Sequence, residues 1–154
     1  MGYFTTANPP AQAYEVIEAV RDLVAGIAAL TTAIGGAANV FEHRNPEPPD
    51  GQWKRIVVRP AIFGDGSRSN VSRSKGVRVD VMVEVQEQVE KPERFLAHAH
   101  ELIFQNIVGQ VLALTKGTAI LGVQPYTDPT AASFDEDDNS FFSTAGYIVA
   151  TVPA

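Results

Sequence analysis

The 154-residue sequence contains no cysteine. It therefore has no disulfide framework, no thiolate nucleophile and no cysteine-bound zinc or iron–sulfur site. A composition of this kind fits a reducing compartment. A chain of this length buries about two-thirds of the surface that its unfolded form exposes, so its core needs no covalent or metal staple. We expect one domain spanning residues 1–154.

Long apolar runs are also missing. No stretch approaches the roughly 20 apolar residues that cross a bilayer, and Met1 to Pro10 has no cationic segment followed by an apolar one. We therefore expect a soluble, non-secreted protein with no membrane partner.

Charge is unevenly distributed around a net value of −6, which argues against bulk adhesion to nucleic acid. Between Lys54 and Arg78 the only acidic residue is Asp65, and the cationic residues are Lys54, Arg55, Arg59, Arg68, Arg73, Lys75 and Arg78. Residues 135–138 form an acidic run. Each segment alone is typical of a solvated loop. Together they permit the basic segment of one copy to contact the acidic run of another.

The first third of the chain predicts a helix and a loop. Asn8 is a suitable cap and Pro9 a suitable first helical residue. Apolar residues then recur at three- and four-residue spacing up to Gly35-Gly36, which predicts one amphipathic helix over 8–34; they are Ile17, Val20, Val24, Ile27 and Ile34. A short extended segment over 39–44 precedes a proline-rich loop over 45–52.

The middle of the chain predicts a long hairpin. Residues 53–63 alternate as a strand, and Pro60 places this strand at an edge or a bulge. Residues 64–75 are rich in glycine, serine and cations, which indicates a flexible hairpin tip. From Val77 to Val85 valine occupies every second position. Period-two alternation predicts a sheet that is covered on its valine face only and polar on the other.

The last third predicts a main helix over 92–114, opened by Pro92, a short strand over 119–126 and an acidic loop over 127–140. A final strand over 141–152 is apolar on both faces, which favours a central position or contact with another subunit. The fold class is therefore α+β, with a mainly antiparallel sheet of about four strands. Two helices pack on one face, and a long hairpin joins the first two main strands.

Several segments match the beginning of a catalytic or metal-binding motif, but each lacks residues that the motif requires. His100-Glu101 begins like a zinc-protease motif, but Phe104 stands where the second histidine belongs. His98 and His100 point to different sides of a helix, so we interpret them as surface histidines. Gly64-Asp65-Gly66 follows a strand but precedes no helix that would cradle a phosphate. We expect no catalytic residue, no cofactor and no metal.

Two loops have some features of binding motifs. Asp135, Asp137 and Asn139 resemble the start of a calcium loop, whose glycine and closing glutamate are replaced by Ser140 and Gly146. A solvated loop is the better interpretation. The basic tip suits phosphates but lacks aromatic residues for base stacking, so a protein partner is favoured over a nucleic acid.

The order of these elements resembles that of the tail terminator and tail completion proteins of long-tailed (siphovirus-like) bacteriophages. The features that carry the resemblance are the N-terminal helix, the proline-rich approach to strand 55–62, the hairpin into Val77–Val85, the helix from Pro92 and the final hairpin with its acidic loop. The resemblance implies a non-enzymatic virion protein of the tail or neck, assembled in the host cytoplasm. It also implies a homo-oligomeric ring, commonly a hexamer, whose partners are the tail tube protein and the head–tail connector. DNA would pass through its channel without sequence-specific binding.

The candidate interface residues rest on this sequence alone, because the family offers no motif to transfer. They are Arg68, Arg73 and Lys75 on the hairpin tip and Asp135, Asp137 and Asp138 on the acidic loop. Three alternatives stay open: another phage neck or tail-tube subunit, a small-molecule-binding or regulatory α+β domain, and a hydrolase in which a histidine meets Asp or Glu in space.

Overall fold

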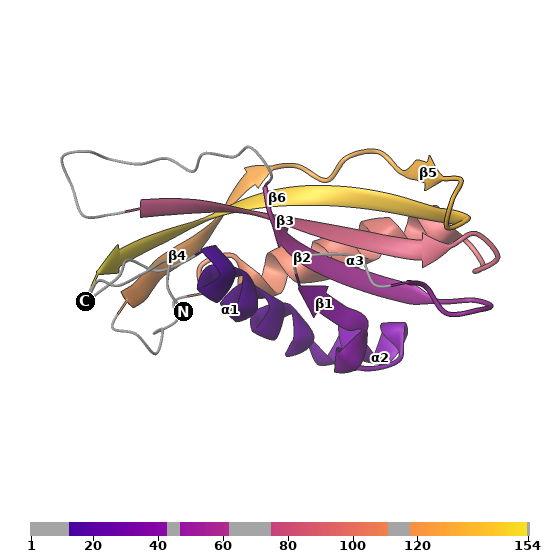
Figure 1. Cartoon of the computed structure of the whole chain (residues 1–154), viewed down its shortest axis with the longest axis horizontal. Helices are drawn as coiled ribbons and strands as arrows, with labels where there is room; N and C mark the ends of the chain where they lie inside the picture. Colours follow the sequence, from indigo (N-terminus) through magenta and orange to yellow (C-terminus); the bar gives the residue numbers. More distant parts are fainter. Residues whose placement is uncertain (1–12, 43–46, 62–74, 111–117, 154) are drawn as a thin grey trace.

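The computed structural model describes residues 13–42, 47–61, 75–110 and 118–153. Its helices lie along one face of a long sheet (Figure 1). The elements are, in chain order, α1 (Ala13–Ala25), α2 (Ala28–Ile34), the 3-10 turn η1 (Ala37–Asn39), β1 (Val40–Glu42), β2 (Lys54–Pro60), β3 (Lys75–Gln86), α3 (Pro92–Ile107), β4 (Thr118–Thr127), β5 (Ser133–Asp135) and β6 (Ser140–Pro153).

The sheet has the order β1-β2-β3-β6-β4, and β5 pairs with β6 beside the start of that strand. The β1–β2 pair is parallel and the remaining pairs are antiparallel. The α+β class, the mainly antiparallel sheet and the long hairpin between β2 and β3 are confirmed. Within the described residues β1 and β5 add two short strands to the four that were expected. Pro60 ends β2 beyond the reach of β1, where its missing N–H costs no ladder bond.

The valines of β3 form the centre of the core, as their spacing predicts. Val79, Val81, Val83 and Val85 are inaccessible to solvent, and they pack in one cluster with residues of α1, α2 and α3. Neighbouring strands add Ile56 to the same face. Each fully buried valine contributes about 1.5–3 kcal/mol relative to an exposed one, which explains why the helices cover this face.

The N-terminal helix is interrupted, whereas one continuous helix was expected. α1 ends at Ala25, and Ile27 has an extended backbone (φ −82°, ψ 99°) before α2 begins. Glycine costs about 1 kcal/mol relative to alanine inside a helix, so Gly26 is a weak point. The break turns Leu30 and Ile34 into the core. Residues 8–12 of the expected helix lie outside the described part of the chain.

α3 ends at Ile107, earlier than the expected Leu114. The N–H of Gly109, a residue with φ +88°, donates to the carbonyl oxygen of Val123 at 2.9 Å. The backbone therefore pairs with β4 instead of continuing the helix. In the described residues no helix is both long enough and apolar enough to span a membrane.

The expectation of a free polar sheet face opposite the helices is wrong at one end. Met82, Glu84 and Gln86 on that face are buried, as is Val57 of β2. Arg78 and Asp80, nearer the other end, are half-buried. The reason lies in a polar network that fills this part of the face.

Candidate functional site

The network joins two neighbouring strands to the acidic turn that follows β5. Arg55 lies directly opposite Glu84 in the β2–β3 register, and its Nε donates to Glu84 Oε1 at 2.7 Å. Ser140 Oγ donates to Glu84 Oε2 at 2.6 Å. Arg55 Nη2 reaches Asp138 Oδ2 at 3.3 Å. Both oxygens of the Glu84 carboxylate are thus hydrogen-bonded.

Burial gives this network its energetic weight. The exposed fraction is 3% for Arg55 and 1% for Glu84. The guanidinium also stacks on the Trp53 ring, 4.6 Å from its centroid. Removing one partner of a buried ion pair leaves the other charge uncompensated and costs about 3–5 kcal/mol. The network therefore fastens the acidic turn to the sheet and fixes the register of β2 against β3.

Three carboxylates in this region approach the arrangement of a metal site. Oxygens of Glu84, Asp135 and Asp138 all lie within 4.8 Å of one another. The Arg55 guanidinium donates to two of these carboxylates, and Asp135 Oδ1 accepts the N–H of Asp137 at 3.0 Å. The positive charge that a cation would supply is already present as Arg55. The arrangement fits an arginine-centred ion-pair network better than a cation site.

The candidate interface residues have different surroundings. Asp138, 25% exposed, contacts Arg55 of its own chain, whereas Asp137 is exposed on the turn. Lys75 opens β3, opposite Thr151 in β6. Arg68 and Arg73 lie outside the described residues. The structure therefore holds one of the acidic candidates in an internal network and leaves Asp137 available to a partner.

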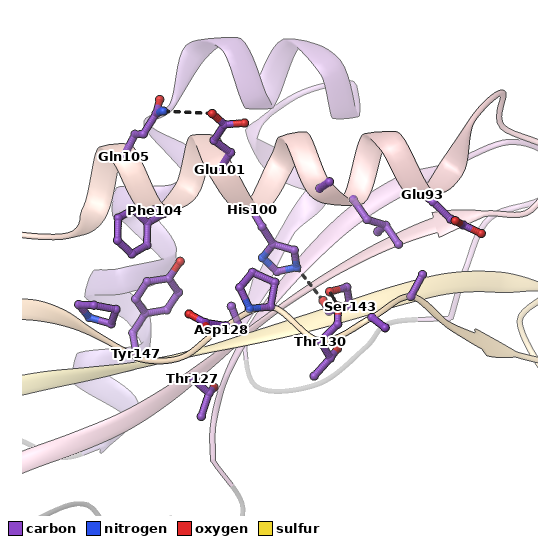
Figure 2. Close-up of a pocket in the computed structure, with 17 residues that line it drawn as sticks. Glu93, His100, Glu101, Phe104, Gln105, Thr127, Asp128, Thr130, Ser143 and Tyr147 are labelled. Carbon is purple, nitrogen blue, oxygen red and sulfur yellow. Dashed lines mark hydrogen bonds between the residues drawn. The ribbon is translucent and has the colours of Figure 1, made fainter.

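A groove runs along α3 on the helix-bearing side of the sheet. Its volume is about 710 Å³, and it lies between α3, the 127–132 segment and β6 (Figure 2). Leu96, Ala145 and Tyr147 are buried side chains along it. Phe104 lines it as well and is 48% exposed. The lining also includes Glu93, Glu101 and Asp128, and none of the described residues that line it is lysine or arginine.

His100 is the main polar group of the groove wall. It is only 3% exposed, and its Nε2 lies 3.0 Å from the carbonyl oxygen of Ser143 (Figure 2). A carbonyl only accepts, so Nε2 carries the proton. Nδ1 is buried without a hydrogen-bond partner among the described residues. Burial lowers the pKa of His100 below its ordinary 6.5, and the Ser143 bond partly opposes that effect.

The sequence-based interpretation of both histidines as surface residues is therefore wrong for His100. His98 is exposed as expected. His100 follows Leu96 by four residues and precedes Ile103 by three, so it shares their buried stripe of α3. That spacing was the signal that could have identified it. Its bond to a backbone carbonyl gives no support to a histidine–carboxylate pair of the hydrolase type.

Comparison with known proteins finds a shared fold at low sequence identity. No family model matches the sequence, and no curated protein matches it. One chain of the virion of a native gene transfer agent (GTA) particle is 16% identical, with a TM-score of 0.50, over 88% of this chain and 91% of that chain. A second solved structure is 17% identical over 90% of this chain and 95% of its own, with a TM-score of 0.42, which is too low to support an argument.

Proposed function

We propose that this chain is a structural protein of a phage-like virion. Its copies form a ring, commonly a hexamer in tail terminators, that caps the tail tube and joins it to the head–tail connector. The observation that carries the proposal is the fold likeness to a chain of the GTA virion, which extends over 88% of this chain. The order of helix, hairpin, helix and final strands, which resembles that of tail terminators, supports the finer role.

Ring formation requires complementary surfaces between neighbouring copies and no chemical reaction. The basic segment around Arg68, Arg73 and Lys75 and the acidic turn with its exposed Asp137 are opposite in charge. Contacts of this kind between neighbouring copies set orientation and register. The net charge of −6 disfavours tight DNA binding, which suits a channel through which DNA slides.

A small-molecule-binding domain is the second candidate, and the groove is the observation that favours it. A volume of about 710 Å³ with apolar walls and one buried imidazole falls within the usual range of ligand pockets. Native mass spectrometry of the purified protein discriminates the two candidates. A retained metabolite would support the ligand-binding domain, and a ring mass without one would support the virion role.

The decisive experiment measures solution mass by light scattering and then images the protein with purified tail tubes. We expect a closed ring that sits as a single layer on the tube end. Rings that stack into tubes would identify a neck or tube subunit instead. A strict monomer that ignores tubes would contradict the proposal.

Charge reversal tests the basic segment. Arg68→Glu with Arg73→Glu should impair ring formation. The matched control reverses two exposed cations at the start of α3, Lys91→Glu with Arg94→Glu, and should leave the ring intact. Normal rings from the first double variant would remove these arginines from the interface.

A further inference from the structure

We infer that the groove beside α3 receives residues 1–12 of a neighbouring copy of this chain. The inference rests on the ring of the proposed function and specifies one of its contacts. The groove offers apolar walls and an aromatic ring, Phe104, whose exposed fraction of 48% is high for a large apolar side chain. Covering this ring removes apolar surface from water.

The composition of residues 1–12 matches the groove better than that of the other segments outside the described structure. They read MGYFTTANPPAQ, with two aromatic residues and no Lys, Arg, His, Asp or Glu. The 62–74 segment includes Ile62, Phe63 and Val71 but also carries Asp65, Arg68 and Arg73. This segment is also held at both ends, between Ala61 after β2 and Lys75 at the start of β3. The 111–117 segment is held at both ends, between Gln110 and β4.

The positions of α1 and the groove favour exchange between copies. α1 packs on β1, β2 and one flank of α3, whereas the groove follows the flank of α3 that faces the 127–132 segment. In Figure 1, α1 and the 127–132 segment before β5 lie on opposite sides of α3. A segment that leaves α1 at Ala13 thus starts on the far side of α3 from the groove of its own chain. This position favours the groove of an adjacent copy over the groove of the same chain.

Reach and hydrogen bonding are also adequate. Twelve extended residues span up to about 40 Å, and α3 with its sixteen residues is about 24 Å long. Pro9 and Pro10 favour an extended backbone at themselves and at the residue before them. An extended segment presents free N–H groups, and the carboxylates of Glu93, Glu101 and Asp128 in the groove lining are acceptors of the matching kind.

Because the sequence contains no cysteine, engineered thiols can form disulfides only with each other. Thr5→Cys places a thiol in the segment, and Ala97→Cys places one at an exposed position that lines the groove. The two full-length variants are mixed during ring assembly, oxidised and analysed by peptide mapping. We expect a disulfide between the two chains. Ala29→Cys, exposed on α2, is the matched control and should give a several-fold lower yield with Thr5→Cys.

A second pair of variants tests the contact without a thiol. Phe104→Ser alters an exposed ring, so folding is preserved, and Tyr3→Ser with Phe4→Ser removes both aromatics of the segment. Each should lower the yield of the cross-link several-fold.

Ring mass is measured in parallel on the unmodified chain, which separates the two proposals. Intact rings without the interchain disulfide would overturn the exchange and leave the ring standing. A Thr5→Cys/Ala97→Cys double variant that closes only within one chain would also overturn it. If neither the rings nor the disulfide form, both proposals are overturned.

Discussion

The Arg55 guanidinium meets the Glu84 carboxylate at 2.7 Å, between neighbouring strands, on the sheet face opposite the helices. Both residues sit where period-two alternation predicts polar side chains facing water. Their burial shows that this end of the second face is internal structure, with Ser140 and Asp138 as further members. The exposed Asp137 on the same turn is then presented by a rigid support.

Replacing Arg55 should lower the stability of the fold. Arg55→Ala leaves Glu84 buried without its counter-charge, so we expect the free energy of unfolding in urea to fall by about 3–5 kcal/mol. Arg94→Ala, at an exposed position of α3, is the control and should change it by no more than about 0.5 kcal/mol. Equal values for the two variants would show that the network contributes nothing to stability.

Stability should fall in acid through His100. Its folded pKa lies below the unfolded value of 6.5, so the unfolded chain takes up the proton first as pH drops. The contribution is fully present above about pH 6.5 and decreases below it. His100→Gln keeps an N–H donor and should flatten that part of the profile of unfolding free energy against pH. His98→Gln, at an exposed position, should leave the profile unchanged; an identical effect of both would contradict the assignment.

Tyr147 should ionise at a higher pH than an ordinary tyrosine. Burial raises its pKa from 10.0 to about 12. Because the folded pKa is raised, its contribution to stability is full below pH 10 and is lost as pH rises toward 12. Ultraviolet titration of tyrosinate should show one of the four tyrosines lagging behind the others. In the Tyr147→Phe variant this high-pH ionisation step should be absent. If the step persists, the raised pKa belongs to another tyrosine.

A side chain at Gly146 should clash with Thr127. Gly146 pairs with Asp80 on β3 and with Thr127 on β4, and an added Cβ would collide with Thr127 Oγ1. Overpacking of this kind costs about 1–3 kcal/mol, so Gly146→Ala should lower the free energy of unfolding by that amount. Thr127→Ala in the same chain should restore most of it. A double-mutant cycle in urea measures the coupling, and additive losses would exclude the clash.

The features that could be predicted from the sequence are those with a local pattern of residues. The valines of β3 are one run whose periodicity identifies both strand and core face. Pro92 and Gly35-Gly36 mark a helix start and a helix end that the structure confirms. The break at Gly26 escaped prediction because Ile27 and Ile34 continue the helical spacing across it.

The polar network and the buried histidine depend on contacts between distant parts of the chain. Glu84 and Ser140 are 56 positions apart, and only the β3–β6 register brings them together. Alternation in β3 tells which residues share a face, but it does not tell what covers that face. His100 was locally recognisable as part of a buried stripe, whereas its partner, a backbone carbonyl in β6, leaves no mark in the sequence.

The position of β6 constrains the order in which the molecule folds. This strand follows all the others along the chain, yet it lies between β3 and β4 and also pairs with β5. During synthesis β2 and β3 can form their hairpin early, while β4 waits for β6, its sheet partner in the described residues. Until β6 has left the ribosome, one edge of β3 stays open to incorrect pairing. Assembly of any ring from this chain must therefore wait until β6 has been synthesised and has paired with β3.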